Sequence, residues 1–183
     1  APIVMDKLVE LMGEEVFREG IHEYLTKYAY GNATWDELIA ILDRLTDENL
    51  ATFSNVWVNQ RGMPHIAFRR EANTLTVEDS DPLGRGLHWP QSFKLTAVVE
   101  SGEHTDFEIK LNGAPVSVAL PHSTQYIIPN SDGRGYGLFL LTKEELNLLL
   151  ECWPRIKSDV ARQATVMNLY ENYLAGNISD IEI

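Results

Sequence analysis

The spacing of apolar side chains changes twice along this sequence, and that change constrains the fold more than any other feature. Through about the first 60 residues, apolar side chains recur every three or four positions, as in amphipathic helices. From about residue 62 to residue 141 the period shortens toward two, and turn-forming residues appear at regular intervals. The helical period then returns. The pattern predicts an α+β fold: short N-terminal helices, a seven-strand antiparallel β-sandwich and C-terminal helices.

Polar and acidic residues mark where three of the helices begin. Thr34 is followed three positions later by Glu37, and Thr142 by Glu145. This spacing is typical of a capping box, in which the hydroxyl and the carboxylate bind backbone N–H groups reciprocally. The pair Glu14-Glu15 indicates a third start, because negative charge is favourable at a helix N-terminus.

Seven strands are predicted in the middle of the chain. Phe107, Ile109 and Leu111 alternate with Glu108 and Lys110, so one face of that strand is apolar and the other polar, as in a sandwich. Short strands with regular turns favour two packed sheets over a barrel. The expected strands are His65–Arg70, Leu75–Glu78, Ser92–Glu100, Asp106–Leu111, Val116–Leu120, Gln125–Ile128 and Tyr136–Leu141.

A long helix is predicted from about Arg155 to Ala175, after an interruption at Trp153-Pro154. One helix with an apolar stripe needs a partner, so it either packs on the sandwich or begins a further helical domain. Its expected apolar side consists of Ile156, Val160, Ala164, Met167, Tyr170 and Leu174.

Charge and hydropathy argue against two classes of partner. The 183 residues include 27 acidic and 15 basic side chains, for a net charge of −12. No basic patch offsets this repulsive field, so no nucleic-acid partner is expected. Residues 1–60 hold 11 of the acidic and 4 of the basic side chains. No apolar run approaches the ~18 residues that a membrane span needs, so no membrane partner is expected.

The nearest approach to a metal motif is His22-Glu23, followed by Thr26. Zinc hydrolases of one large class need two histidines a helical turn apart, with a glutamate beside the first. Thr26 stands where the second histidine must be, and a hydroxyl is a poor substitute for imidazole. The other histidines have no repeated ligand spacing and are interpreted as surface or loop residues: His65, His88, His104 and His122.

Nucleophile and phosphate-binding motifs are also missing. The sequence has no Gly-x-Ser-x-Gly elbow. Its one cysteine, Cys152, is interpreted as a buried helix residue beside Trp153 rather than as a nucleophile. Gly84-Arg85-Gly86 and Gly133-Arg134-Gly135 are interpreted as turns, because neither lies between a strand and a helix. The residues alone therefore predict no catalytic, cofactor-binding or metal-ligating residue in this chain.

Three aromatic residues leave a binding function open. Trp89, Tyr126 and Tyr136 could line a peptide or carbohydrate groove on the sandwich. Core aromatic residues explain the same pattern equally well.

Five runs in the first third of the chain carry a resemblance to a known family. They are Val4–Leu8, Leu11–Gly20, Tyr24-Leu25, Tyr28–Thr34 and Trp57–Pro64. In order and spacing, residues 1–68 resemble the end of the catalytic domain in the zinc aminopeptidase N family, the gluzincin exopeptidases that remove N-terminal residues from peptides. Beyond that point the order of elements is similar to the family's, through Trp89-Pro90, Gly135-Tyr136-Gly137 and Asp159-Val160-Ala161.

The resemblance implies three parts. Residues 1–61 would be the helical end of the catalytic domain, residues 62–141 a β-sandwich domain, and residues 142–183 the start of a C-terminal helical domain. It also implies that the zinc ligands, the general base and the tyrosine that steadies the tetrahedral oxyanion all precede Ala1. Zinc is thus expected in the parent protein, and no cofactor and no site residue are expected in this chain.

The resulting hypothesis is a non-catalytic structural fragment of a zinc-dependent aminopeptidase. Peptides would be substrates of the parent, and the fragment itself would contact the missing catalytic and C-terminal domains. Two alternatives stay open: a stand-alone sandwich that binds peptide or glycan, and the scaffold of an inactive aminopeptidase homologue.

Overall fold

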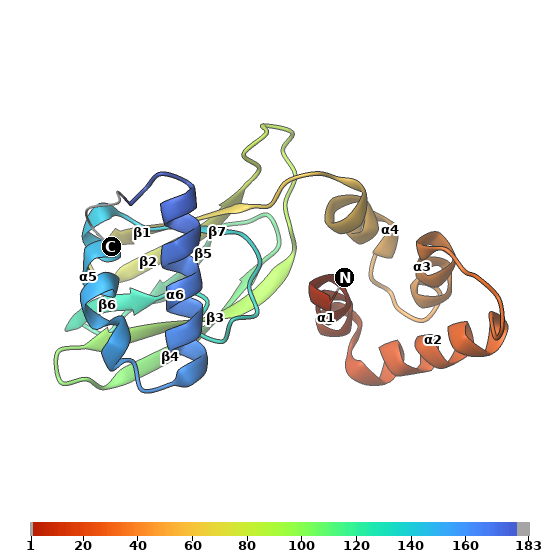
Figure 1. Ribbon diagram of the computed structural model, residues 1–183, viewed down its shortest axis with the longest axis horizontal. Helices are drawn as coiled ribbons and strands as arrows, with labels where there is room; N and C mark the ends of the chain where they lie inside the picture. The colour runs from red at the N-terminus through yellow and green to blue at the C-terminus, as the bar shows by residue number, and fades with distance from the viewer. Residues whose placement is uncertain (1, 179–183) are drawn as a thin grey trace. The chain divides into compact units, whose positions relative to one another are not determined.

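The computed structural model describes residues 2–178. The chain divides into two units, with the boundary between Arg61 and Gly62, and each unit is described by itself. The first unit is helical, and the second combines two β-sheets with helices (Figure 1). The predicted α+β class is therefore confirmed. No helix within residues 2–178 has both the length and the hydropathy to cross a membrane.

Four α-helices and a π-helical turn form the first unit. They are α1 (Pro2–Met12), α2 (Glu14–Lys27), α3 (Trp35–Asp43), α4 (Leu50–Ser54) and η1 (Asn55–Asn59). Gly13 separates α1 from α2 and has a φ of 85°. Glycine adopts a positive φ at little cost, which favours it at this break between the helices. The predicted capping box of α3 is present: Thr34 Oγ1 accepts from the Glu37 N–H, and Glu37 accepts from the Thr34 N–H.

The core of the first unit forms where these helices contact one another in sequence order. Helix α2 packs on α3, and α3 packs on α4. Leu42 on α3 and Leu50 on α4 are fully buried, and the rings of Phe53 and Trp57 stack with centroids 5.8 Å apart. The apolar spacing therefore agrees with the buried residues of α3, α4 and η1, whereas Leu25 on α2 was expected on a packed face and is 62% exposed.

The seven predicted strands are confirmed in the second unit. They are β1 (His65–Glu71), β2 (Thr74–Ser80), β3 (Gln91–Val99), β4 (His104–Leu111), β5 (Val116–Ala119), β6 (Thr124–Ile128) and β7 (Leu138–Leu140). One sheet has the order β5-β2-β1-β7 and the other β4-β3-β6.

One strand pair departs from the expected antiparallel arrangement. Strand β7 runs parallel to β1, with His65 opposite Leu138 and Ala67 opposite Leu140. The cause is topological: β7 follows a long loop from β6 in the other sheet and enters the first sheet in the same direction as β1. All other pairs in the two sheets are antiparallel.

The two sheets enclose a single apolar core. Ile66, Leu75 and Val77 come from the first sheet, and Phe93 and Leu95 from the second, all essentially without exposed surface. These residues alternate with more exposed ones along their strands, as expected for sheets with one face inside a sandwich.

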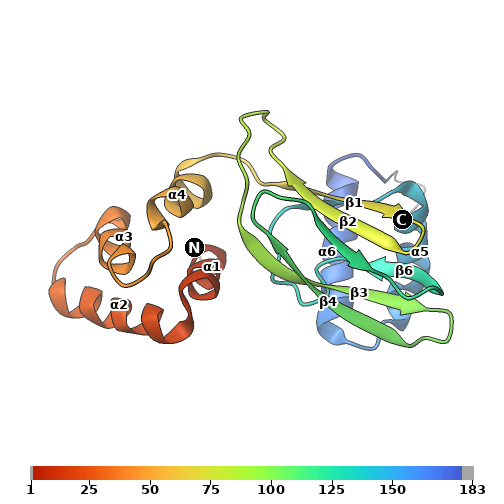
Figure 2. The ribbon, with the colours of Figure 1, turned by 180° about the vertical axis from the view of Figure 1, so that it is seen from behind.

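Helices close one side of the sandwich. They are α5 (Lys143–Cys152), the 3₁₀ turn η2 (Trp153–Arg155) and α6 (Asp159–Leu174). Helix α5 packs on β6 and α6 packs on β7, which are edge strands of the two sheets. Figure 1 shows the two helices in front of the strands, and Figure 2, from the opposite side, shows the strands in front. The edges at β6 and β7 are thereby covered, which protects these two strands from pairing with other chains.

The long C-terminal helix differs from its prediction in where it begins. The interruption at Trp153-Pro154 is confirmed as the turn η2. However, α6 begins at Asp159 rather than near Arg155, because Ile156 is extended and Ser158 forms the N-cap, its Oγ accepting from the Ala161 N–H at 3.2 Å.

The face that α6 turns toward the sandwich also differs from the predicted one. Val160, Met167, Tyr170 and Leu174 were expected on the packed side, but all four are exposed. Polar groups explain the difference: Asn168 Nδ2 donates to the Pro129 C=O at 2.8 Å, and Asn172 Nδ2 donates to the Phe139 C=O at 2.9 Å. The helix is oriented by amides that bind one backbone carbonyl just after β6 and one within β7, together with small buried residues beside them.

Candidate functional site

A cleft of about 750 Å³ lies in the second unit. Strands β3, β4 and β6 form one wall, and α5, η2 and the first turn of α6 form the other. Apolar lining residues include Ile128, Leu148 and Val160, and charged ones include Asp106 and Arg155. The cleft is therefore lined by apolar side chains together with charged side chains of both signs.

A short chain of hydrogen bonds joins three polar residues that line this cleft. Thr96 Oγ1 lies 2.6 Å from Asp106 Oδ1 and 2.8 Å from Ser131 Oγ. Because a hydroxyl has one hydrogen and a carboxylate only accepts, Thr96 donates to Asp106 and accepts from Ser131. The β3–β4 register places Thr96 directly opposite Asp106. These three side chains supply hydrogen-bond partners to one another, so they stabilise the wall of the cleft.

A thiol and a phenol meet where α5 approaches β6. Burial raises the pKa of Tyr126 to about 12, with a smaller contribution from Cys152. Burial also raises the pKa of the Cys152 thiol, against the opposing effects of the Tyr126 hydrogen bond and Arg155. Both groups are therefore neutral near pH 7, and a neutral thiol is a weak nucleophile. The interpretation of Cys152 as a buried helix residue is confirmed.

The histidines are dispersed over separate elements. His22 is exposed on α2, where Thr26 Oγ1 donates to the His22 C=O at 2.8 Å. His88 Nδ1 lies 3.2 Å from the buried Asp79 carboxylate, and His122 contacts Asn73. Across residues 2–178, no group of three or more His, Cys, Asp or Glu side chains is arranged to hold a metal ion.

The three aromatic candidates do not form one surface. Trp89 is only 2% exposed, so of its two interpretations the core residue holds and the groove residue does not; its backbone N–H donates to Asp79 in the interior. Tyr126 lines the cleft, whereas Tyr136 does not. The backbone of Tyr136 is held instead by the Gln91 side chain, which both donates to its C=O and accepts from its N–H.

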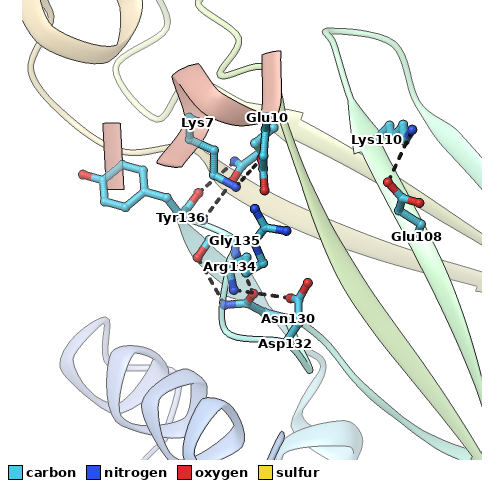
Figure 3. Close-up of polar contacts among 10 residues, drawn as sticks. Lys7, Glu10, Glu108, Lys110, Asn130, Asp132, Arg134, Gly135 and Tyr136 are labelled. Carbon is cyan, nitrogen blue, oxygen red and sulfur yellow. Dashed lines mark hydrogen bonds and ion pairs between the residues drawn. The ribbon is translucent and has the colours of Figure 1, made fainter. Parts of the chain in front are cut away.

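Both glycine-flanked arginine loops are turns held by their own side chains. Arg85 donates to Asp81 through Nε and Nη2, each at 2.9 Å, and this contact lowers the pKa of Asp81 well below its usual range. In the second loop, the Asn130 side chain accepts from the Gly135 N–H and donates to the Gly135 C=O (Figure 3). In the first loop, the N–H groups of Leu83 and Arg85 also donate to the Asp81 carboxylate, in agreement with the turn interpretation.

Sequence reasoning missed the cleft itself. Thr96, Ser131 and Cys152 lie far apart in the chain and come together only through the β3–β6 pairing and the bend at η2. The one signal present was the helix interruption at Trp153-Pro154, which predicts a change of direction but not the strand that faces it.

Comparison with known proteins finds a family match within the first unit. Residues 2–57 match the model of the peptidase family M1 domain. This segment covers α1 to α4 and most of η1.

Curated relatives agree with this match. Aminopeptidase M1-C of Oryza sativa subsp. japonica is 30% identical over 83 residues, which is 45% of this chain and 10% of the relative. Aminopeptidase M1-A of the same species is 26% identical over 135 residues, covering 60% of this chain and 15% of the relative. Aminopeptidase N of Lactobacillus delbrueckii subsp. lactis is 31% identical over 77 residues, covering 42% and 9%. The chain thus spans only a small part of these relatives' length. Residues 2–57 of this chain are therefore similar in sequence to the peptidase family M1 domain.

Proposed function

We propose that this chain is a supporting segment of a zinc-dependent M1 aminopeptidase and carries no residue of its catalytic site. The observation that carries the proposal is the M1 match over residues 2–57, together with relatives named as aminopeptidases. In such a parent, Zn²⁺ polarises the scissile carbonyl and activates water. The parent would act on peptides from the N-terminus.

Among residues 2–178, no set of side chains fits a zinc site. In the nearest motif, Thr26 replaces the second histidine, and its hydroxyl is already bonded to the His22 carbonyl. No third ligand accompanies His22 among residues 2–178. No step of the reaction is therefore assigned to this chain, and the zinc ligands, general base and oxyanion tyrosine are proposed to lie outside residues 1–183.

The part that this chain contributes is then structural. The capped, closely packed helices of the first unit would support the catalytic domain from which they come. The sandwich with its two helices would act as a spacer, and residues 142–183 would lead into a C-terminal helical domain. Contacts with these other parts of the parent stay a prediction.

Activity measurements test this division. The purified 183-residue chain, with stoichiometric zinc, is expected to hydrolyse aminoacyl chromogenic substrates no faster than buffer, while the full-length parent turns them over. His22→Ala is expected to change neither rate, because His22 lies on an exposed helix face.

Two outcomes would contradict the proposal. Zinc-dependent turnover by residues 1–183 that is lost on His22→Ala would assign a catalytic centre to this chain. A full-length parent that is folded but inactive with zinc would instead support the alternative that this chain is the scaffold of an inactive aminopeptidase homologue.

A second candidate function, peptide or glycan binding, is favoured by one observation: Tyr126 lines the 750 Å³ cleft. Calorimetric titration of the 183-residue chain with short peptides and with oligosaccharides tests it. Saturable binding that is lost in Tyr126→Ala but kept in Tyr136→Ala would support this candidate, since Tyr136 lies outside the cleft. Absence of saturable heat with both ligand classes would exclude it.

A further inference from the structure

Helix α6 has two different faces, and only one of them is used within residues 2–178. Its inner face is buried and consists of Ala161, Ala164, Thr165, Asn168, Leu169 and Asn172. Its other face presents a line of large apolar side chains, which we name the outer stripe: Val160, Val166, Met167, Tyr170 and Leu174. Their exposed fractions run from 41% for Val166 to 60% for Leu174.

The spacing of the outer stripe is that of a helix-packing seam. Val160, Met167 and Leu174 are seven residues apart, and Tyr170 lies between the last two. Apolar residues at such intervals fall on one side of a helix and fit the grooves of a second helix. At ~1.5 Å per residue the stripe extends for about 21 Å, or nearly four turns. This length matches a helix better than a small ligand.

The stripe continues onto its neighbour. Val160 also lines the cleft beside α5, where Leu148 is 40% exposed. The apolar surface therefore runs along α6 and into the cleft, where α5 and the first turn of α6 form one wall. A contiguous exposed surface of this kind is typical of an interface rather than of a free protein surface.

We infer that the outer stripe is the docking face for an amphipathic helix from another part of the same polypeptide. This inference rests on the proposed function, in which the chain is one segment of a longer M1 protein. The length of the relatives supports an occupant in the same polypeptide, because the matched segments make up only 9% to 15% of three of them. Glu171 flanks the stripe beside Met167 and Leu174, so a basic or neutral flank is expected on the docked helix.

Methionine oxidation provides a direct measurement. Met167 is 51% exposed at the centre of the stripe, whereas Met12 is 8% exposed and serves as a slow internal reference. Both the 183-residue chain and the full-length parent are treated with hydrogen peroxide, with N-acetylmethionine as a common standard, and the products are quantified by peptide mass spectrometry. Oxidation of Met167 is expected to be at least about tenfold slower in the parent.

The concentration dependence separates the outcomes. Protection of Met167 in the parent at every protein concentration supports docking within one polypeptide. Protection that appears only as concentration rises would mean that a second copy covers the stripe, and this would overturn the inference. Equal oxidation in parent and fragment would overturn it as well.

Two further variants extend the test along the stripe. Val160→Met and Leu174→Met place reporters about two turns on either side of Met167, and both are expected to be protected together with it in the parent. Protection at Met167 alone would contradict a docked helix.

Activity on the same preparation distinguishes the two proposals. A protected Met167 in a parent without aminopeptidase activity would reject the proposed function but keep the docking face. An exposed Met167 in an active parent would reject the docking face but keep the proposed function.

Discussion

Gly137 allows the parallel strand β7 to approach β1 closely. Its φ is +146°, and a Cβ at this position would lie 2.7 Å from the Pro64 carbonyl oxygen, the acceptor for the Leu138 N–H. A side chain would therefore meet backbone, which cannot move aside as a flexible side chain can. Gly133 is different: its φ is +70°, but a Cβ there would meet nothing within 4 Å.

This contrast predicts unequal costs for two similar substitutions. Gly133→Ala should lower the free energy of unfolding by about 1 kcal/mol, the cost of the left-handed backbone conformation alone. Gly137→Ala should lower it by at least about 3 kcal/mol, because strain and overlap add. Urea unfolding followed by circular dichroism measures both, and equal effects would contradict the close approach.

The Asp81 carboxylate gives the protein a contribution to stability that depends on pH. Arg85 holds the pKa of Asp81 below its usual range. A carboxyl whose pKa is lower in the folded state stabilises that state above its unfolded pKa, near 4, and the contribution is lost as pH falls below that value.

Asp81→Asn should accordingly lower the melting temperature by a constant amount above about pH 5, and the difference should shrink as the pH is lowered below about 4. Thermal scans of both proteins across pH 3 to 7 provide the measurement. Glu108→Gln, on the exposed face of β4, is the matched control and should have little effect at any pH. A difference for Asp81→Asn that grows toward low pH would contradict the assigned pKa direction.

At the scale of elements, α6 is positioned by its asparagines. Asn172 is fully buried; its Nδ2 donates to the Phe139 and Asn168 carbonyls, and its Oδ1 accepts from Asn177. If apolar spacing alone oriented α6, the side with Val160, Met167 and Leu174 would face the strands. Local propensity predicted where the helix lies, but its orientation depends on carbonyls that come from residues more than thirty positions away.

Asn172→Ala should therefore destabilise the second unit by about 2–3 kcal/mol, because the Phe139 carbonyl would be buried without a partner. Gln163→Ala, on the exposed side of the same helix, should change stability by less than about 0.5 kcal/mol. Chemical denaturation compares the two. If Asn172→Ala were as mild as Gln163→Ala, docking of α6 would depend on apolar contacts alone.

Features that form within a few consecutive residues could be predicted from the sequence, whereas features that depend on contacts between distant segments could not. Both capping boxes are present as expected, because each forms within four consecutive residues. The strand positions also follow from local alternation. The sheet order β4-β3-β6, the parallel pair β1–β7 and the burial of Trp89 do not, since each depends on which segments meet in space. Only Tyr126 among the predicted aromatic residues reaches the cleft.

At the scale of the molecule, the boundary at Arg61 and Gly62 separates two units with their own internal contacts. The second unit has a sandwich core and a further apolar cluster beneath α5 and α6. This cluster includes Leu146 and Leu149 of α5 and Leu169 of α6. Such a unit has the size and the enclosed core that an independently folding domain needs.

Residues 62–183 expressed alone should therefore unfold in one cooperative transition, with near-ultraviolet circular dichroism typical of fixed aromatic packing. Residues 62–141, which lack the helices that cover β6 and β7, should be markedly less stable or associate through exposed edges. If the longer piece bound a hydrophobic dye and lacked a cooperative transition, the second unit would depend on other parts of the protein.

The parallel pairing of β1 with β7 also has a consequence during synthesis. Strand β1 leaves the ribosome before one of its two neighbours in the sheet, which is encoded about seventy residues later, at Leu138–Leu140. Until those residues emerge, the nascent chain carries a half-paired strand in need of shielding, by chaperones or by transient local contacts. Translation pauses before Leu138 would prolong this vulnerable interval, whereas pauses after it would not.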